Sequence, residues 1–172
     1  QELTAKQIVN TYSETALADL LFAYGELRNA KKIAQLILQK RPGEIATTMQ
    51  LNEVLHPVLP KGNEHKVLAK IYQALRMEVN KEIEVLQSFL TQSKDVLRSG
   101  GRLSVISYHS LEDRIVKRFI QNGNFDSEPE KDDFGNPTLY FKKCGGLVVP
   151  DQEEINQNNR ARSAKLRIAQ RL

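Results

Sequence analysis

The stretch Ser-Gly-Gly-Arg-Leu-Ser-Val-Ile-Ser-Tyr-His-Ser-Leu-Glu-Asp-Arg, residues 99–114, decides the fold class of this chain. Two glycines mark a turn, an apolar run of strand length follows, and a helix start comes directly after it. Ser110 and Asp113 have the spacing of a capping box, which satisfies free backbone N–H groups of the first helical turn. Apolar residues then recur at helical spacing through residue 120. The stretch therefore predicts a turn, a buried strand and a capped helix, which is one half of an α/β layout.

The residues between this strand and helix are the first candidates for a functional site. In open α/β sheets, ligands bind beyond the carboxyl ends of the strands. Ser107, Tyr108 and His109 occupy that position. A structural interpretation stays open beside the functional one, because a lone histidine often only fixes a turn and because capping alone explains Ser110 and Asp113.

The chain before residue 99 has the pattern of helices. A long helical pattern runs from His65 to Arg98, broken near Asn80, and we expect it to lie on a face of the sheet. Arg76 and Asn80 lie one turn apart on it, which predicts a hydrogen bond between segments. Residues 4–55 read as shorter amphipathic helices, and the loop at 61–64 follows them. These patterns predict a helical domain at 1–63 and an α/β domain at 64–172.

The chain after residue 122 is less regular. Residues 123–137 are rich in Gly, Asp and Pro and predict a loop. Residues 138–143 alternate as a strand does, and residues 147–149 predict another extended piece. Residues 164–169 fit a strand or a helix equally well by pattern alone.

Composition excludes several classes of protein. The 172 residues include one cysteine, Cys144, and three histidines without zinc-like spacing, so we expect neither a disulfide framework nor a metal site. The chain has no apolar run near the roughly 20 residues that cross a bilayer, and no signal-peptide pattern. We therefore expect a cytoplasmic protein that does not bind a membrane.

Positive charge gathers in two parts of the chain. Residues 61–124 carry eleven basic and seven acidic side chains, and residues 152–172 carry five and two. Such clustering is typical of a surface that contacts a phosphate backbone, although solvated helix faces give the same pattern. The candidates for phosphate contacts are Arg114, Arg160, Arg162, Lys165 and Arg167.

Residues 99–114 closely resemble the signature of the RsmH (MraW) family. Members of this family are methyltransferases that use S-adenosylmethionine to modify the exocyclic N4 amine of a cytidine in 16S ribosomal RNA. Further blocks that fit the family are Gln73-Ala74-Leu75-Arg76-Met77-Glu78-Val79-Asn80, Arg160-Ala161-Arg162-Ser163-Ala164-Lys165-Leu166-Arg167 and, more loosely, Tyr24-Gly25-Glu26 with Ala30-Lys31-Lys32-Ile33-Ala34. Two places depart from the family pattern, at His65-Lys66-Val67-Leu68-Ala69 and at Asn158-Asn159.

The resemblance implies a fold and a place for this chain in it. It implies the C-terminal half of a Rossmann-like class I methyltransferase with a parallel sheet, plus a helical insertion domain at 1–63 that recognises substrate. The chain contains neither a Gly-x-Gly turn nor an Asp-Pro-Pro-Tyr-like motif. We therefore expect no cofactor-binding residues in it, an S-adenosylmethionine site in a missing N-terminal half, and an inactive fragment.

The resemblance also implies partners. We expect 16S ribosomal RNA or the small ribosomal subunit as substrate, with Ser107, Tyr108 and His109 beside the methylation centre and the basic candidates on the RNA. Strand 103–107 should pair with the carboxyl-terminal strand on one side only. Its open edge predicts self-association, for example as a homodimer.

Two other functions compete with this one. A non-enzymatic helical RNA-binding or adaptor module fits the helices and the charge. A fragment of a dehydrogenase fits the strand and helix of residues 99–122, but it explains neither the block at 73–80 nor the block at 160–167.

Overall fold

Lys81 interrupts the long helical pattern, because its backbone adopts a left-handed conformation with φ 50°. α5 (Glu64–Val79) ends before it and α6 (Glu82–Val96) begins after it. The guanidinium of Arg76 donates to both carboxylate oxygens of Glu82 at 2.8 and 3.0 Å, and the Asn80 amide donates to one of them at 3.0 Å. The predicted break near Asn80 and the predicted hydrogen bond between segments are therefore both confirmed.

The computed structural model describes residues 3–172, and the chain divides into two units beside this break. One unit ends at Glu82, and the other runs from Ile83 to Leu172. The first unit is entirely helical. Its helices are α1 (Ala5–Thr11), α2 (Glu14–Gly25), α3 (Ala30–Lys40), α4 (Thr48–Leu55) and α5, with short 3-10 turns η1 (Arg41–Gly43) and η2 (His56–Val58).

Side-chain caps set the starts of several of these helices. Thr4 and Thr47 form capping boxes with Gln7 and Gln50, and the Ser13 hydroxyl accepts from the Ala16 N–H at 3.1 Å. Apolar residues at helical spacing then face one core, and α5 contributes to it. Ile71, Ala74 and Leu75 of α5 are buried in that core.

The burial of α5 changes the domain boundary. The sequence places the boundary after residue 63, at a polar loop, whereas the structural division follows Glu82. The loop at 61–64 only connects two helices of the same unit. One face of α5 packs into the helical core. The break in the apolar pattern near Asn80 therefore predicts the boundary between the units better than the polar loop at 61–64 does.

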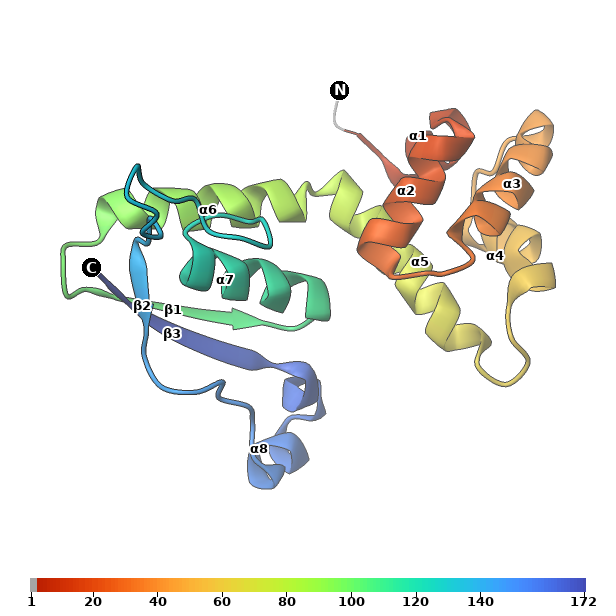
Figure 1. Ribbon diagram of the computed structural model, residues 1–172. Helices are drawn as coiled ribbons and strands as arrows, with labels where there is room; N and C mark the ends of the chain where they lie inside the picture. The colour runs from red at the N-terminus through yellow and green to blue at the C-terminus, as the bar shows by residue number, and fades with distance from the viewer. Residues whose placement is uncertain (1–2) are drawn as a thin grey trace. The chain divides into compact units, whose positions relative to one another are not determined.

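The second unit is built on a three-stranded sheet (Figure 1). Its strands are β1 (Arg102–Ser107), β2 (Phe141–Lys143) and β3 (Lys165–Arg171), in the order β1-β3-β2. Both pairings are antiparallel, so the expected parallel sheet is not what these strands form. The carboxyl-terminal strand does pair with β1, as predicted, and residues 164–169 fall mostly in strand rather than helix.

One face of this sheet is covered by α6 and α7 (Ser110–Asn122). The opposed residues Leu103 and Ala169 point to the covered face and are buried with Phe119 and Phe141. Side chains alternate along a strand, so the other face carries Ile106, which is 58% exposed. The expectation that the long helical pattern lies on the sheet therefore holds for α6, while α5 belongs to the helical unit.

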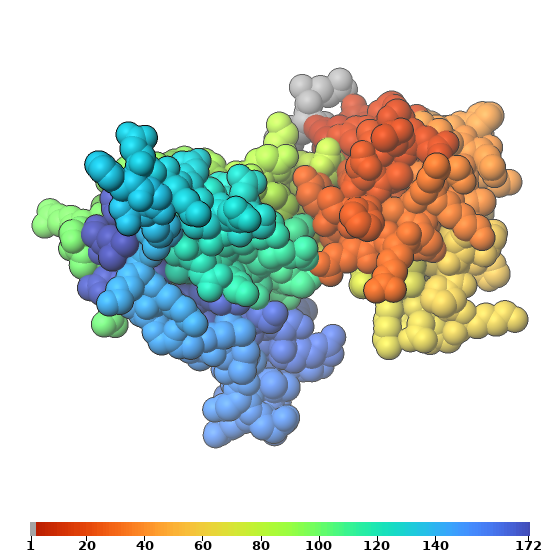
Figure 2. Space-filling view, in the orientation of Figure 1, coloured from red at the N-terminus to blue at the C-terminus, as the bar shows by residue number. Residues whose placement is uncertain are grey.

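A projecting segment joins β2 to β3. It contains α8 (Gln152–Gln157) and η3 (Asn159–Ser163), and Figure 2 shows it standing out from the rest of the second unit. The structure is thus mostly helical with a small sheet, which confirms the predicted α/β class.

Candidate functional site

The end of β1 brings together the three residues that the sequence singles out. Ser107 is the last residue of the strand and is buried, and its hydroxyl lies 3.5 Å from the Lys165 carbonyl oxygen of β3. Tyr108 follows and is 54% exposed. His109 is the N-cap residue of α7. A buried serine, an exposed aromatic ring and a histidine therefore follow one another at the strand end.

The Glu112 carboxylate holds this turn in place. Its Oε2 atom accepts hydrogen bonds from the backbone N–H groups of Tyr108 at 3.0 Å and of His109 at 3.4 Å. The predicted capping box of Ser110 and Asp113 is therefore wrong by one residue. His109 keeps an extended backbone, with φ −128° and ψ 160°, and the helix begins only at Ser110. Glu112 is thus the third helical residue, from which a carboxylate reaches back to the N-cap.

Asp113 has a different role, because it faces the sheet and is buried. It accepts two hydrogen bonds from Arg167 of β3, at 2.7 and 3.1 Å, and one from the Lys165 ammonium at 3.4 Å. Burial acts to raise the pKa of Asp113, but the hydrogen bond and the charge of Arg167, together with Lys165, outweigh burial. The pKa of this carboxyl therefore lies below its ordinary value, and the group is ionised near neutral pH.

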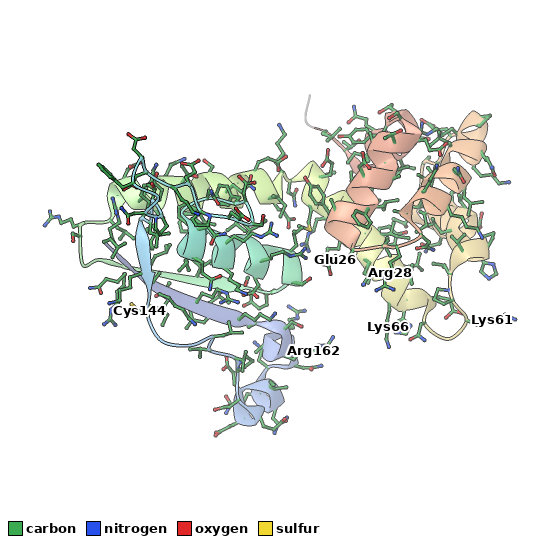
Figure 3. The ribbon with its side chains drawn as sticks, in the orientation of Figure 1. Glu26, Arg28, Lys61, Lys66, Cys144 and Arg162 are labelled. Atoms are coloured by element: carbon green, nitrogen blue, oxygen red, sulfur yellow. The ribbon has the colours of Figure 1, made fainter. Side chains whose placement is uncertain are left out.

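The remaining basic candidates lie on the surface. Arg114 is exposed on the first turn of α7, and Arg160 and Arg162 are exposed on η3. The Asn158 side chain accepts from the Arg160 N–H at 3.1 Å, and Ala161 is buried between the two arginines, which turns both outward. Figure 3 shows Arg162 extending away from the strands.

Residues 3–172 contain no group of three or more His, Cys, Asp or Glu side chains that could hold a metal ion. None of the helices in this range is both long and apolar enough to cross a membrane.

The family model of the MraW methylase family matches residues 1–172. The chain belongs to this family. Among curated proteins, it is 56% identical over 172 residues to ribosomal RNA small subunit methyltransferase H of Christiangramia forsetii. Proteins of the same name from Flavobacterium johnsoniae and Bacteroides fragilis are 55% and 46% identical to it.

These alignments cover almost the whole of this MraW-family chain, but they cover only part of each relative. They include 99% of this chain and 57% of the Christiangramia forsetii and Flavobacterium johnsoniae proteins, and 98% and 56% for the Bacteroides fragilis protein. The chain therefore spans a little over half the length of the relatives that it matches.

The geometry divides the predicted site residues of this MraW-family chain into two groups. Ser107, Tyr108 and His109 lie together at the strand end, and the exposed cations Arg114, Arg160 and Arg162 could reach a ligand in solution. Arg167 and Lys165 instead contact the buried carboxylate of Asp113, at 2.7 and 3.4 Å.

Sequence reasoning missed Glu112, whose signal was available. In a capping box, an acidic side chain lies three residues after the N-cap residue. Two pairs in the sequence have this spacing, namely His109 with Glu112 and Ser110 with Asp113. Only the length of the strand decides between the two positions. Because β1 ends at Ser107, Tyr108 and His109 make the turn and the cap falls on His109.

Proposed function

We propose that this chain is the part of a ribosomal RNA small-subunit methyltransferase that contacts the RNA. The whole enzyme transfers a methyl group from S-adenosylmethionine to the N4 amine of a cytidine in 16S ribosomal RNA. The observation that carries the proposal is the family match over residues 1–172, together with the names of relatives up to 56% identical. These names favour neither an adaptor module nor a dehydrogenase.

The reaction asks mainly for positioning. A cytosine amine is a weak nucleophile, because its lone pair is delocalised into the ring, so it must be held in line with the methyl group that it attacks. The base must also leave its stack, which calls for a pocket wall and for contacts to the flanking phosphates. We assign the wall to Ser107, Tyr108 and His109, where the exposed Tyr108 ring offers a surface for stacking.

The residues at the strand end do not fit the methyl donor itself. A bound donor needs acceptors for its ribose hydroxyls and its amino group, and the carboxylates here are Glu112 and Asp113. Glu112 already accepts from two backbone N–H groups, and Asp113 pairs with Arg167 and Lys165. We therefore assign the donor site to residues outside this chain.

The open edge of β1 fits a larger sheet of Rossmann-like type. Among the described strands, β1 pairs only with β3. Beside the free edge lies a mainly apolar groove of about 500 Å³, whose lining includes Phe89, Val96 and Leu97 of the α6 region. We propose that a further strand of the full-length enzyme occupies this edge.

A methyl-transfer assay tests the role of the strand end. In a full-length enzyme that contains this sequence, we expect His109→Ala to lower methyl transfer to small ribosomal subunits by about 100-fold, as misplacement of a reacting group does. His65→Ala, which changes an exposed histidine on α5, is the matched control. Equal rates for His109→Ala and the unaltered enzyme would remove His109 from the site.

Calorimetry tests the assignment of the donor site. We expect S-adenosylmethionine to bind the full-length enzyme and to leave the 172-residue chain without measurable heat of binding. A donor that binds the 172-residue chain with the same affinity would place the donor site within these residues and refute the assignment.

A further inference from the structure

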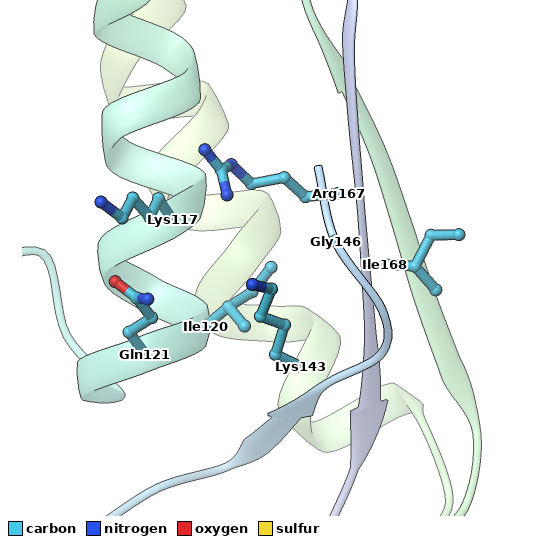
Figure 4. A pocket seen from close by; sticks show the side chains of 7 residues that line it. All are labelled: Lys117, Ile120, Gln121, Lys143, Gly146, Arg167 and Ile168. Carbon is cyan, nitrogen blue, oxygen red and sulfur yellow. The ribbon is translucent and has the colours of Figure 1, made fainter. Parts of the chain in front are cut away.

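A second basic surface lies at the edge of the sheet opposite β1, where α7 packs against β2 and β3. A small hollow opens there in the second unit (Figure 4). Its lining includes Lys117, Ile120, Gln121, Lys143, Gly146 and Arg167. These residues come from four separate segments, namely α7, β2, the loop after β2, and β3. Of these residues, only Arg167 belongs to the candidate site residues predicted from sequence.

The two lysines at this hollow have no acidic partner in the part of the chain that the structure describes. Lys117 and Lys143 are both exposed, and neither has a carboxylate within 4.0 Å among residues 3–172. The third cation, Arg167, pairs with Asp113 instead. Two lysines therefore line one hollow, and neither has an ion-pair partner among residues 3–172.

The elements around the hollow reinforce this charge. After Asp113, neither the rest of α7 nor β2 or β3 contains an acidic residue. The rest of α7 and the α7-facing positions of β2 and β3 carry seven basic residues, which are Arg114, Lys117, Arg118, Lys143, Lys165, Arg167 and Arg171. A surface with so uneven a charge attracts polyanions at ordinary ionic strength.

The size of the hollow limits what can enter it. Its volume of about 10 Å³ admits one water-sized group. A phosphate oxygen fits that space, whereas a base or a whole nucleotide does not. Gly146 leaves the rim open, because nothing lies within 4 Å of the place where a Cβ atom would stand. The Gln121 amide can donate a further hydrogen bond, and lysine ammonium groups bind phosphate as point charges.

We propose that this hollow binds a phosphodiester group of the RNA backbone, held between Lys117 and Lys143. The assignment rests on the proposed function and adds to it a phosphate contact besides Arg160 and Arg162. RNA fits better than an acidic protein segment, because further cations, Arg114 and Arg118, continue along α7 beyond the hollow. That continuation matches a polymer with one charge at every unit.

Salt-dependent binding of single-stranded oligouridylate to the 172-residue chain tests the site. We expect the double variant Lys117→Gln with Lys143→Gln to bind several-fold more weakly at low salt. The slope of log affinity against log salt should become shallower by about 0.7 for one lost phosphate contact. Both lysines are exposed, so the variant keeps its fold, which the NMR spectrum of the backbone amides verifies.

The neighbouring lysine supplies a matched control. Lys142 is opposite Gln170, while Lys143 is opposite the buried Ala169, so the two lysines point to different faces of the sheet. We expect Lys142→Gln to shift the slope less than Lys143→Gln does. Equal effects of the two substitutions would mean that only net charge matters, and would overturn the site.

The remaining outcomes separate the site from the proposed function. If RNA binds the unaltered chain and the double variant shows the same slope of log affinity against log salt, the hollow is not a phosphate site. This outcome leaves the proposed methyltransferase function untouched. If the unaltered chain binds no RNA, the proposed phosphate site is refuted. The methyl-transfer assay then tests the proposed function independently. If polyglutamate binds as tightly and depends equally on Lys117 and Lys143, the assignment to RNA is refuted.

Discussion

The carboxylate of Asp113 accepts two hydrogen bonds from the guanidinium of Arg167, at 2.7 and 3.1 Å, across 54 residues of sequence. Both side chains are largely buried, with 12% and 15% of their surface exposed. The pair ties the first turn of α7 to β3, which itself pairs with β1. The turn of Ser107, Tyr108 and His109 is therefore held by the sheet on one side and by this ion pair on the other.

We expect Asp113→Asn to destabilise the second unit by about 3 kcal/mol, because it leaves the charge of Arg167 buried without its partner. The free energy of unfolding can be followed by hydrogen exchange at Ala169, which lies in the core of this unit. Arg162→Leu changes an exposed arginine and serves as the control, with an effect within about 0.5 kcal/mol. Equal protection of Ala169 in Asp113→Asn and the unaltered chain would contradict a stabilising role for the pair.

The same pair makes the stability of the second unit depend on pH in the acid range. The folded pKa of Asp113 lies below its ordinary value of 3.8. Its stabilising contribution is therefore complete well above pH 3.8 and is lost as the pH falls below that value through the folded pKa. We expect the difference in unfolding free energy between the unaltered chain and Asp113→Asn to shrink over this range. A difference that stays constant in acid would show that the charge of Asp113 is not what stabilises the fold.

The division after Glu82 predicts which unit a core substitution weakens. Ile71 is buried in the helical unit and Leu103 in the second unit, so we expect Ile71→Ala and Leu103→Ala each to cost about 2–5 kcal/mol in its own unit. Hydrogen exchange at Ile37 reports on the first unit, and exchange at Ala169 reports on the second. If Ile71→Ala lowered protection at Ala169 more than at Ile37, α5 would belong with the sheet, as the loop at 61–64 suggested.

The exposed arginines of η3 predict a second effect of salt. Reversing both charges, with Arg160→Glu and Arg162→Glu, should flatten the salt dependence of RNA binding if these side chains contact phosphates. The expected change is about 1.4 in the slope for two contacts to a single strand. The matched control is Glu153→Gln with Glu154→Gln on α8, which changes charge on the same projecting segment. An unaltered slope in the arginine variant would refute the contacts.

Local patterns in the sequence were enough to predict α6, β1 and α7 of the second unit, but they left β3 open between strand and helix and did not predict α8. The glycine turn, the strand predicted at 103–107 and the helix predicted to about residue 122 follow from the spacing of apolar residues and from the two glycines, and the structure places them at Arg102–Ser107 and Ser110–Asn122. The cap was misplaced by one residue, because the end of the strand depends on its pairing with β3 and not on its own residues. Strand 138–143 shortened to Phe141–Lys143 for the same reason, since only these residues find partners in β3.

Charges were harder to assign from sequence than elements were. Arg167 and Arg162 belong to the same basic block, yet one pairs with a buried carboxylate and the other is exposed. Arg167 lies on β3, where it meets Asp113 of α7, whereas Arg162 lies in η3 before the strand begins. The pattern of residues 164–169 did not distinguish a strand from a helix, so it could not predict this difference. The sequence did not predict that Lys117 and Lys143 line one hollow, because they lie 26 residues apart. Only the packing of α7 on β2 brings them together.

The free edge of β1 predicts self-association of the 172-residue chain. An edge with unpaired backbone groups, flanked by the apolar groove beside α6, can pair with the same edge of a second copy around a two-fold axis. We expect sedimentation velocity to detect dimers whose fraction rises with protein concentration. Ser104→Lys places a charge beside this edge and should shift the equilibrium to monomer, while Ser163→Lys on η3 should leave the dimer in place. A chain that stays monomeric at all concentrations would show that the free edge of β1 does not drive self-association. The edge would then serve only to pair with the further strand of the full-length enzyme proposed above.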